Sequence, residues 1–189
     1  MDWISENFSE HQQIIALVAE QCRQDIIATS LILLRTLQQG GTIFWCGNGG
    51  SAADSQHLAA ELVGRFKADR RPLRSVALST DSSVLTCVAN DYSFDAIFAR
   101  QITALGRPGD VLVSISTSGN SENVVQALQA AKASGLHTVG LLGNCGGKAR
   151  SLVDLSIVVP STTTARIQEA HILIGHCLCD LIEEGLGLN

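Results

Sequence analysis

The sequence has six cysteines but no C-x-x-C pair, and it has no run of about 18 apolar residues that could cross a membrane. A signal-peptide pattern is also missing from its start. These absences predict a cytoplasmic protein with reduced thiols and no membrane association. Cys46, Cys87 and Cys177 lie in apolar runs, so they are expected to be small core residues.

Charged residues are scarce, at 16% of the chain, and the net charge is -5. This balance does not suit a general nucleic-acid-binding protein, so no nucleic acid is expected as a partner. A local basic stretch is interpreted for the most part as a solvated loop; it comprises Arg65, Lys67, Arg70, Arg71 and Arg74. Hydrophobic residues make up 46% of the chain and the mean hydropathy is +0.22, which predicts surfaces that are buried by oligomerisation.

Two glycine patterns typical of nucleotide sites are missing. The glycines after Cys46 do not fit G-x-G-x-x-G, and no Walker pattern occurs. No nucleotide cofactor is therefore predicted.

The order of predicted elements indicates a single domain over residues 1–189. Residues 1–40 have helical periodicity, as one long helix or a broken pair, and this helical extension either forms an oligomer interface or packs on its own domain. Residues 41–189 alternate between short apolar runs and helical patterns, which predicts an α/β fold. We expect three layers, with a doubly wound, five-stranded parallel sheet covered by helices on both faces. The predicted strands are 42–46, 75–78, 111–115, 137–142 and 155–159, and the predicted helices are 51–67, 82–90, 94–105, 121–133, 147–152 and 163–186.

Two loops at the ends of predicted strands are candidates for ligand binding. Hydroxyl side chains gather between the third strand and the next helix; these are Ser116, Thr117, Ser118 and Ser121. One hydroxyl would suffice for an ordinary helix N-cap, whereas four beside free backbone N–H groups suit a phosphate. The glycine-rich loop from Gly47 to Ser51 allows a ligand to approach the backbone closely. Ligands of such sheets bind beyond the carboxyl ends of the strands, so both loops are expected to face one site.

Two pairs of polar residues on predicted helices could perform chemistry. His57 and Glu61 are four residues apart and share a helix face, and Gln168 and His176 lie on the last helix. This spacing is compatible with proton transfer, with metal binding, with a surface His–Glu pair or with a buried structural histidine. Spacing alone does not separate a sugar-phosphate isomerase from a sugar-phosphate sensor.

Four segments, taken together and in order, resemble the sugar isomerase (SIS) domain, and more narrowly the bacterial phosphoheptose isomerase family. They are Gly47-Asn48-Gly49-Gly50-Ser51, Asn90-Asp91, Ser116-Thr117-Ser118-Gly119-Asn120-Ser121 and Ala165-Arg166-Ile167-Gln168-Glu169. The resemblance covers nearly the whole chain, and its specificity comes from the combination of segments.

The resemblance implies an isomerase that converts D-sedoheptulose 7-phosphate to D-glycero-D-manno-heptose 7-phosphate, the first step toward the ADP-heptose of the lipopolysaccharide core. It also implies a homotetramer with sites between subunits. The phosphate would contact Ser116, Thr117, Ser118 and Ser121, and the sugar would contact Asn48, Gly49, Gly50, Ser51, Glu61, Asn90, Asp91 and Gln168. Glu61 and His176 match the catalytic acid–base pair of the family. His57, Glu61, Gln168 and His176 match a site for one zinc ion per subunit.

The chemistry of the implied reaction fits these residues. Moving a carbonyl between adjacent carbons requires a base, for which the Glu61 carboxylate is suited, and an acid, for which the His176 imidazole is suited. Ligation of zinc by Glu61 would compete with its role as a base, and both roles stay open.

Two departures from the family pattern leave alternatives. Ala165 stands where some members carry an acidic residue, which puts one substrate contact in question. The ending from Cys177 to Glu183 also resembles tetrameric SIS adaptors that bind the replication initiator DnaA and lack the catalytic carboxylate. The presence of Glu61 favours an enzyme over an adaptor. An isomerase of another phosphosugar fits the same hydroxyl cradle.

Overall fold

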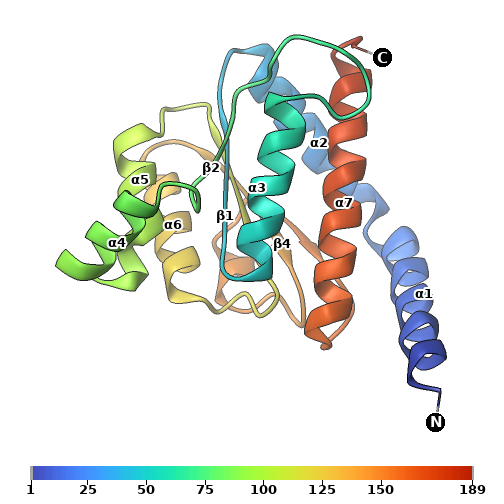
Figure 1. Cartoon of the computed structure of the whole chain (residues 1–189). Coiled ribbons are helices and arrows are strands. Elements are labelled where there is room, and N and C mark those ends of the chain that lie inside the picture. Colours follow the sequence, from blue (N-terminus) through green and yellow to red (C-terminus); the bar gives the residue numbers. More distant parts are fainter. Residues whose placement is uncertain (1, 189) are drawn as a thin grey trace.

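The computed structural model describes residues 2–188 and contains a five-stranded sheet, in which all strands are parallel (Figure 1). The strand order is β2-β1-β3-β4-β5. The strands are β1 (Ile43–Gly47), β2 (Ser75–Ala77), β3 (Val111–Ser116), β4 (His137–Leu142) and β5 (Leu155–Val158). Each strand was expected from its short apolar run. Because both faces of the central strands are buried, these runs are continuous and do not alternate with polar residues.

Helices cover both faces of the sheet, so the predicted three-layer, doubly wound α/β fold is confirmed (Figure 1). One face packs against α2 (Arg23–Gln38), α3 (Gly50–Val63) and α7 (Thr164–Gly185). The other packs against α4 (Ser82–Asp91), α5 (Ile97–Leu105) and α6 (Glu122–Ala133). Short 3-10 helices lie at Phe94–Ala96 and Lys148–Ser151. Along β1, Ile43 and Trp45 belong to the first core and Phe44 and Cys46 to the second, as the two-residue period of a strand requires.

The N-terminal extension is a broken pair of helices. The first helix, α1 (Trp3–Gln21), is followed by Cys22, and α2 begins at the next residue. Near its start α1 leaves large apolar side chains exposed, among them Trp3 and Phe8, which are 70% and 66% exposed. Its other side docks on α7, where His11 Nδ1 lies 2.7 Å from Glu169 Oε2.

One helix boundary is a correction. The helix predicted for residues 51–67 ends at Val63, and no regular helix follows before β2. The reason is that a side-chain carboxylate competes with the helix carbonyls for the backbone N–H groups that follow Val63. The backbone N–H groups of Phe66, Lys67 and Ala68 donate to the Glu183 carboxylate, so they do not donate to the carbonyls one turn earlier.

The expectation for the cysteines is only partly right. Cys46 is fully buried, and burial raises the pKa of its thiol to about 12. Cys87 and Cys177 are exposed, so their assignment to the core is wrong. Both lie on amphipathic helices, where the next residue along the chain, Val88 or Leu178, faces the core instead. Within residues 2–188, no helix combines the length and the apolar character needed to cross a bilayer.

Candidate active site

The two predicted ligand loops meet at the point where the strand order changes direction. β1 and β3 are neighbours in the sheet, with Gly47 paired to Ile115, although β2 lies between them in the sequence. The chain leaves β1 toward one edge of the sheet and leaves β3 toward the other. Loops that diverge in this way open a crevice beyond the strand ends.

A pocket of about 100 Å³ occupies this crevice. It is lined by Asn48, Ser51, Ile115, Ser116, Thr117, Ser121 and Gln168. Ser51 lies in the first turn of α3, and Ser121 is the N-cap residue of α6. Two helix N-termini, each with a partial positive charge, therefore border one small polar pocket. This combination suits a phosphate.

The geometry of the hydroxyl loop separates the two interpretations of its serines. Ser121 makes no side-chain hydrogen bond to α6, so its hydroxyl is not spent on capping the helix. Ser116 Oγ accepts the Gly119 N–H at 3.0 Å, which folds the loop back on itself. Gly119 has φ +66°, and a Cβ there would collide with the Gly146 carbonyl. The turn therefore requires glycine. Ser116, Thr117 and Ser121 of this loop line the pocket.

A residue that the sequence analysis missed orients Asn48. The side chains of Asn48 and Asn123 form a reciprocal amide pair, with both Nδ2···Oδ1 distances at 2.8 Å. Asn123 is only 2% exposed and belongs to the first turn of α6. No local pattern marks this asparagine, because its partner lies 75 residues away in the chain. The pair fixes the Asn48 side chain between α3 and α6.

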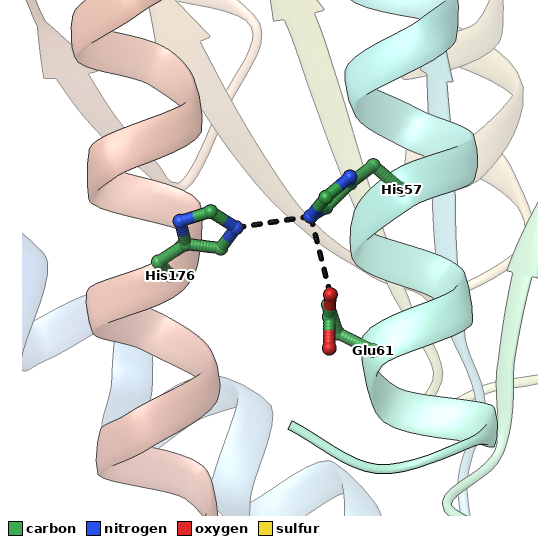
Figure 2. A group of neighbouring side chains, drawn as sticks. All are labelled: His57, Glu61 and His176. Carbon is green, nitrogen blue, oxygen red and sulfur yellow. Dashed lines mark hydrogen bonds and ion pairs between the residues drawn. The ribbon is translucent and has the colours of Figure 1, made fainter. Parts of the chain in front are cut away.

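A cluster of two imidazoles and a carboxylate lies farther along α3 and α7 (Figure 2). His57 Nε2 is 3.0 Å from His176 Nε2 and 3.2 Å from Glu61 Oε1. The two helices can approach here because Gly175 has no side chain. A Cβ at that position would lie 2.5 Å from Leu58 Cδ2. The structure thus brings together three of the four residues predicted as metal ligands.

Gln168, the fourth predicted ligand, lies at the other end of the helix pair. It lines the pocket beside the hydroxyl loop and contacts Gly50 at the start of α3. The pairs Gly50–Gln168 and His57–His176 are two successive levels along α3 and α7. They are separated by about 10 Å, because seven residues of helix rise 1.5 Å each. An extended phosphosugar anchored in the pocket would therefore run toward the His–Glu–His cluster.

A second unanticipated residue lies between these levels. Asp54 is on α3, one turn before His57, and its Oδ2 atom is buried without a hydrogen-bond partner. Burial raises the pKa of the Asp54 carboxyl above its ordinary value, against the opposing effect of nearby His57. A buried oxygen that lacks a donor has hydrogen-bonding capacity left for a ligand hydroxyl.

Besides Glu61, which belongs to the cluster, five predicted substrate contacts are not among the residues that line the pocket. Asn90 and Asp91 are exposed at the end of α4, where Asn90 Nδ2 donates to Asp91 Oδ1 at 2.7 Å. Ser118 is exposed, and its hydroxyl accepts the Asn120 N–H. Gly49 and Gly50 form the start of α3, next to the pocket. All five residues remain predicted contacts.

The donor set of the cluster fits zinc. Ligand atoms of His57, Glu61 and His176 all lie within 4.8 Å of one another. Two imidazole nitrogens and one carboxylate oxygen form a common catalytic zinc set, in which a further position stays open for water or substrate.

Fold and site together define a class of phosphosugar-binding α/β protein, and the comparisons identify it. A family model for the SIS domain matches residues 6–143. A phosphoheptose isomerase from Nitratiruptor sp. is 53% identical over 97% of this chain and 98% of that protein.

Solved structures agree with the sequence comparison. A structure of phosphoheptose isomerase GmhA from Neisseria gonorrhoeae is 43% identical, with a TM-score of 0.92 over 96% of this chain and 97% of that one. A phosphoheptose isomerase from Francisella tularensis is 36% identical, with a TM-score of 0.94 over 97% of both chains. The chain therefore belongs to the phosphoheptose isomerase family of SIS domain proteins.

Proposed function

We propose that this protein is a sugar-phosphate isomerase that converts D-sedoheptulose 7-phosphate to D-glycero-D-manno-heptose 7-phosphate. The observation that carries this proposal is the pair of levels along α3 and α7. A phosphate-sized polar pocket lies at one level, and a carboxylate and two imidazoles lie at the next. The name phosphoheptose isomerase, borne by relatives about half identical over nearly their whole length, supports the choice of a seven-carbon substrate.

In the proposed mechanism, the phosphate is an anchor. Hydroxyls of Ser116, Thr117 and Ser121 and the helix N-termini bind it, and Asn48 and Gln168 orient the adjoining carbons. Fixing the chain in this way places the carbonyl beside the cluster and removes most of the entropic cost of the reaction.

The proton transfers are assigned to two side chains. Glu61 takes the proton from the carbon next to the carbonyl, and His176 delivers a proton to the carbonyl oxygen. The resulting enediol then becomes the aldose: Glu61 returns its proton to the former carbonyl carbon, and His176 takes the proton of the hydroxyl on the neighbouring carbon, which restores both groups. His57, within hydrogen-bonding distance of both Glu61 and His176, holds the two groups in position. A zinc ion bound by His57, Glu61 and His176 would supply Lewis acidity toward the substrate oxygens. Gln168, the fourth ligand expected from the sequence, lies about 10 Å farther along the helix pair in this chain, so we assign it to the substrate.

The proposal extends to assembly and cellular role. A homotetramer with sites between subunits would cover the exposed apolar side chains of α1, such as Trp3 and Phe8. Asn90 and Asp91 are exposed in one chain. In such a tetramer they would contribute to the substrate site of a neighbouring subunit. We place the enzyme in the cytoplasm, at the first step toward the ADP-heptose of lipopolysaccharide.

The test is an NMR assay of sedoheptulose 7-phosphate with metal-stripped and zinc-loaded protein. The expected result is the appearance of the aldoheptose 7-phosphate signals. Five- and six-carbon ketose phosphates serve as competitors. Faster turnover of one of them would identify that sugar phosphate as the substrate instead of sedoheptulose 7-phosphate. Binding of DnaA without turnover of any sugar phosphate would show that the protein is an adaptor and not an enzyme.

A further inference from the structure

The segment between α3 and β2 is held in place by one buried carboxylate. Glu183, near the end of α7, is 0% exposed. Its Oε1 accepts the Phe66 N–H at 3.1 Å, and its Oε2 accepts the Lys67 N–H at 3.0 Å and the Ala68 N–H at 3.3 Å. Burial alone raises the pKa of this carboxyl, but the backbone donors and Arg70 outweigh burial and hold it below its ordinary value. Glu183 is therefore ionised at neutral pH and determines the path of the segment.

Arg70 extends this contact to the end of α3. Its Nε lies 2.7 Å from Glu183 Oε1, and the two side chains are 1% and 0% exposed. The same guanidinium donates to the carbonyls of Glu61 at 2.8 Å and Leu62 at 2.9 Å. These carbonyls belong to the last turn of α3, where no further helical N–H follows, and the Leu62 carbonyl also accepts the Leu73 N–H at 3.0 Å. Arg70 thus fixes the backbone of the residue that carries the proposed base.

Phe66 extends the contact to the proposed acid. The Phe66 ring stacks on the His176 imidazole, with centroids 5.5 Å apart and an angle of 28° between the planes. The centroid of the His57 ring also lies near that of His176, at 5.1 Å. His176 therefore has two rings beside it, and one of them, Phe66, belongs to the segment whose backbone N–H groups donate to Glu183.

We propose that Glu183 and Arg70 are positioning residues for the isomerase reaction, which hold Glu61 through its backbone and His176 through Phe66. The catalytic part of this inference, an effect on turnover, rests on the proposed function. Its structural part, that Glu183 determines where Phe66 lies, stands independently of any activity.

The competing explanation is that the buried pair only stabilises the fold. Buried ion pairs often contribute little net stability compared with apolar residues of the same size, so stability alone is a weak reason for this arrangement. The two explanations differ in what they predict for a variant that still folds. A stabilising pair leaves the site of a folded variant intact, whereas a positioning pair does not.

The first measurement uses fluorine NMR of protein labelled with 4-fluorophenylalanine. The chain has five phenylalanines, and the Phe66 resonance is assigned by its loss in Phe66→Leu. In Glu183→Gln we expect the Phe66 resonance to shift and the other four to stay. The matched control is Asp110→Asn, because Asp110 is also a buried carboxylate that accepts backbone N–H groups, those of Thr42 and Arg107. It should leave the Phe66 resonance in place.

The second measurement is steady-state kinetics. Glu183→Gln should lower kcat by about 10²-fold, because small displacements of catalytic groups have effects of this size. KM should change by less than about threefold, because the phosphate pocket is formed by other elements. Phe66→Leu, which removes the stacked ring from a half-buried position, should lower kcat by about tenfold with the fold intact.

The outcomes separate the two ideas. An unmoved Phe66 resonance in Glu183→Gln, or five resonances that move together, overturns the positioning role. If Glu183→Gln does not fold, the same comparison is made with Arg70→Lys, which keeps the charge but loses donors to α3. A wild-type protein without isomerase activity, in which only the Phe66 resonance responds to Glu183→Gln, would refute the proposed function and leave the structural part standing.

Discussion

His57 Nε2 and His176 Nε2 lie 3.0 Å apart, and Glu61 Oε1 lies 3.2 Å from the same His57 atom. One nitrogen of His57 thus faces both a second imidazole and a carboxylate. A single proton on His57 Nε2 cannot satisfy both neighbours with good geometry, whereas one cation can be shared by all three groups.

The first prediction concerns this metal. Dialysed protein should take up about one Zn²⁺ per chain, as measured by calorimetry and elemental analysis. His176→Gln should lower the affinity by more than the roughly 10–100-fold typical of lost outer-shell partners. His11→Gln is the control, because His11 also pairs with a glutamate, Glu169, but lies on α1. Equal affinity in wild type and His176→Gln would remove the cluster as a metal site.

The second prediction separates chemistry from binding. Glu61→Gln should lower kcat by about 10²–10⁴-fold, the usual contribution of a positioned base. Sugar-phosphate binding, followed by calorimetry, should change little because the anchor lies one level away on α3. His176→Gln should cost at least about 10²-fold in kcat. Glu184→Gln alters an exposed carboxylate on α7 and should behave as wild type. Near-normal turnover by Glu61→Gln would assign the base elsewhere.

The third prediction concerns the phosphate pocket. Ser121→Ala should raise KM about tenfold, because a hydrogen bond to a charged group is worth about 1.5–3 kcal/mol. Its thermal stability should hardly change, since the Ser121 hydroxyl does not cap α6. Asp81→Ala should lower the thermal stability and leave KM unchanged. Asp81 Oδ1 caps α4 by accepting the Val84 N–H at 3.0 Å, and losing such a cap costs about 1 kcal/mol of stability. If Ser121→Ala loses stability and keeps its KM, the hydroxyl is only structural.

The fourth prediction concerns the amide pair behind the pocket. Asn123→Asp keeps the size of the side chain but removes the donor that Asn48 Oδ1 accepts. We expect KM to rise about tenfold, because Asn48 loses its fixed orientation and an acceptor is left unpaired. An unchanged KM, together with a melting temperature below wild type, would limit Asn123 to a packing role.

The fifth prediction concerns pH. His171 is fully buried, and desolvation lowers its pKa from 6.5 to about 4, although the Leu142 carbonyl bond opposes this. Between these values the unfolded chain binds a proton that the folded chain does not, so stability falls as the pH falls. From pH 7 to pH 5 the loss should be about 2 kcal/mol per chain. Urea titrations at fixed protein concentration should show a smaller loss for His171→Gln, and an equal loss in both proteins would assign the pH dependence to other groups.

The predictable part of this protein was whatever depends on neighbours in sequence. The strands followed from apolar runs, and the hydroxyl loop followed from its place after β3. His57 and Glu61 were placed on one face because helical spacing alone requires it.

What could not be predicted depends on contacts between distant segments. Asn123, on α6, has its role only because its side chain pairs with Asn48, which directly follows β1. Arg70 belonged to a stretch interpreted mainly as solvated, yet its side chain is buried against Glu183, 113 residues later. No local pattern reveals such pairing, and the same pairing ended α3 earlier than its helical periodicity indicated.

The two levels along α3 and α7 also set a length requirement on whatever binds. If the phosphate binds at the Gly50–Gln168 level and the carbonyl reacts at the His57–His176 level, the carbon chain between them must span about two helical turns. Shorter ketose phosphates, bound by the same hydroxyls, would not reach Glu61 and would therefore occupy the site without reacting. Discrimination by reach needs no dedicated contact with each sugar hydroxyl, and it would make triose and tetrose phosphates inhibitors and not substrates.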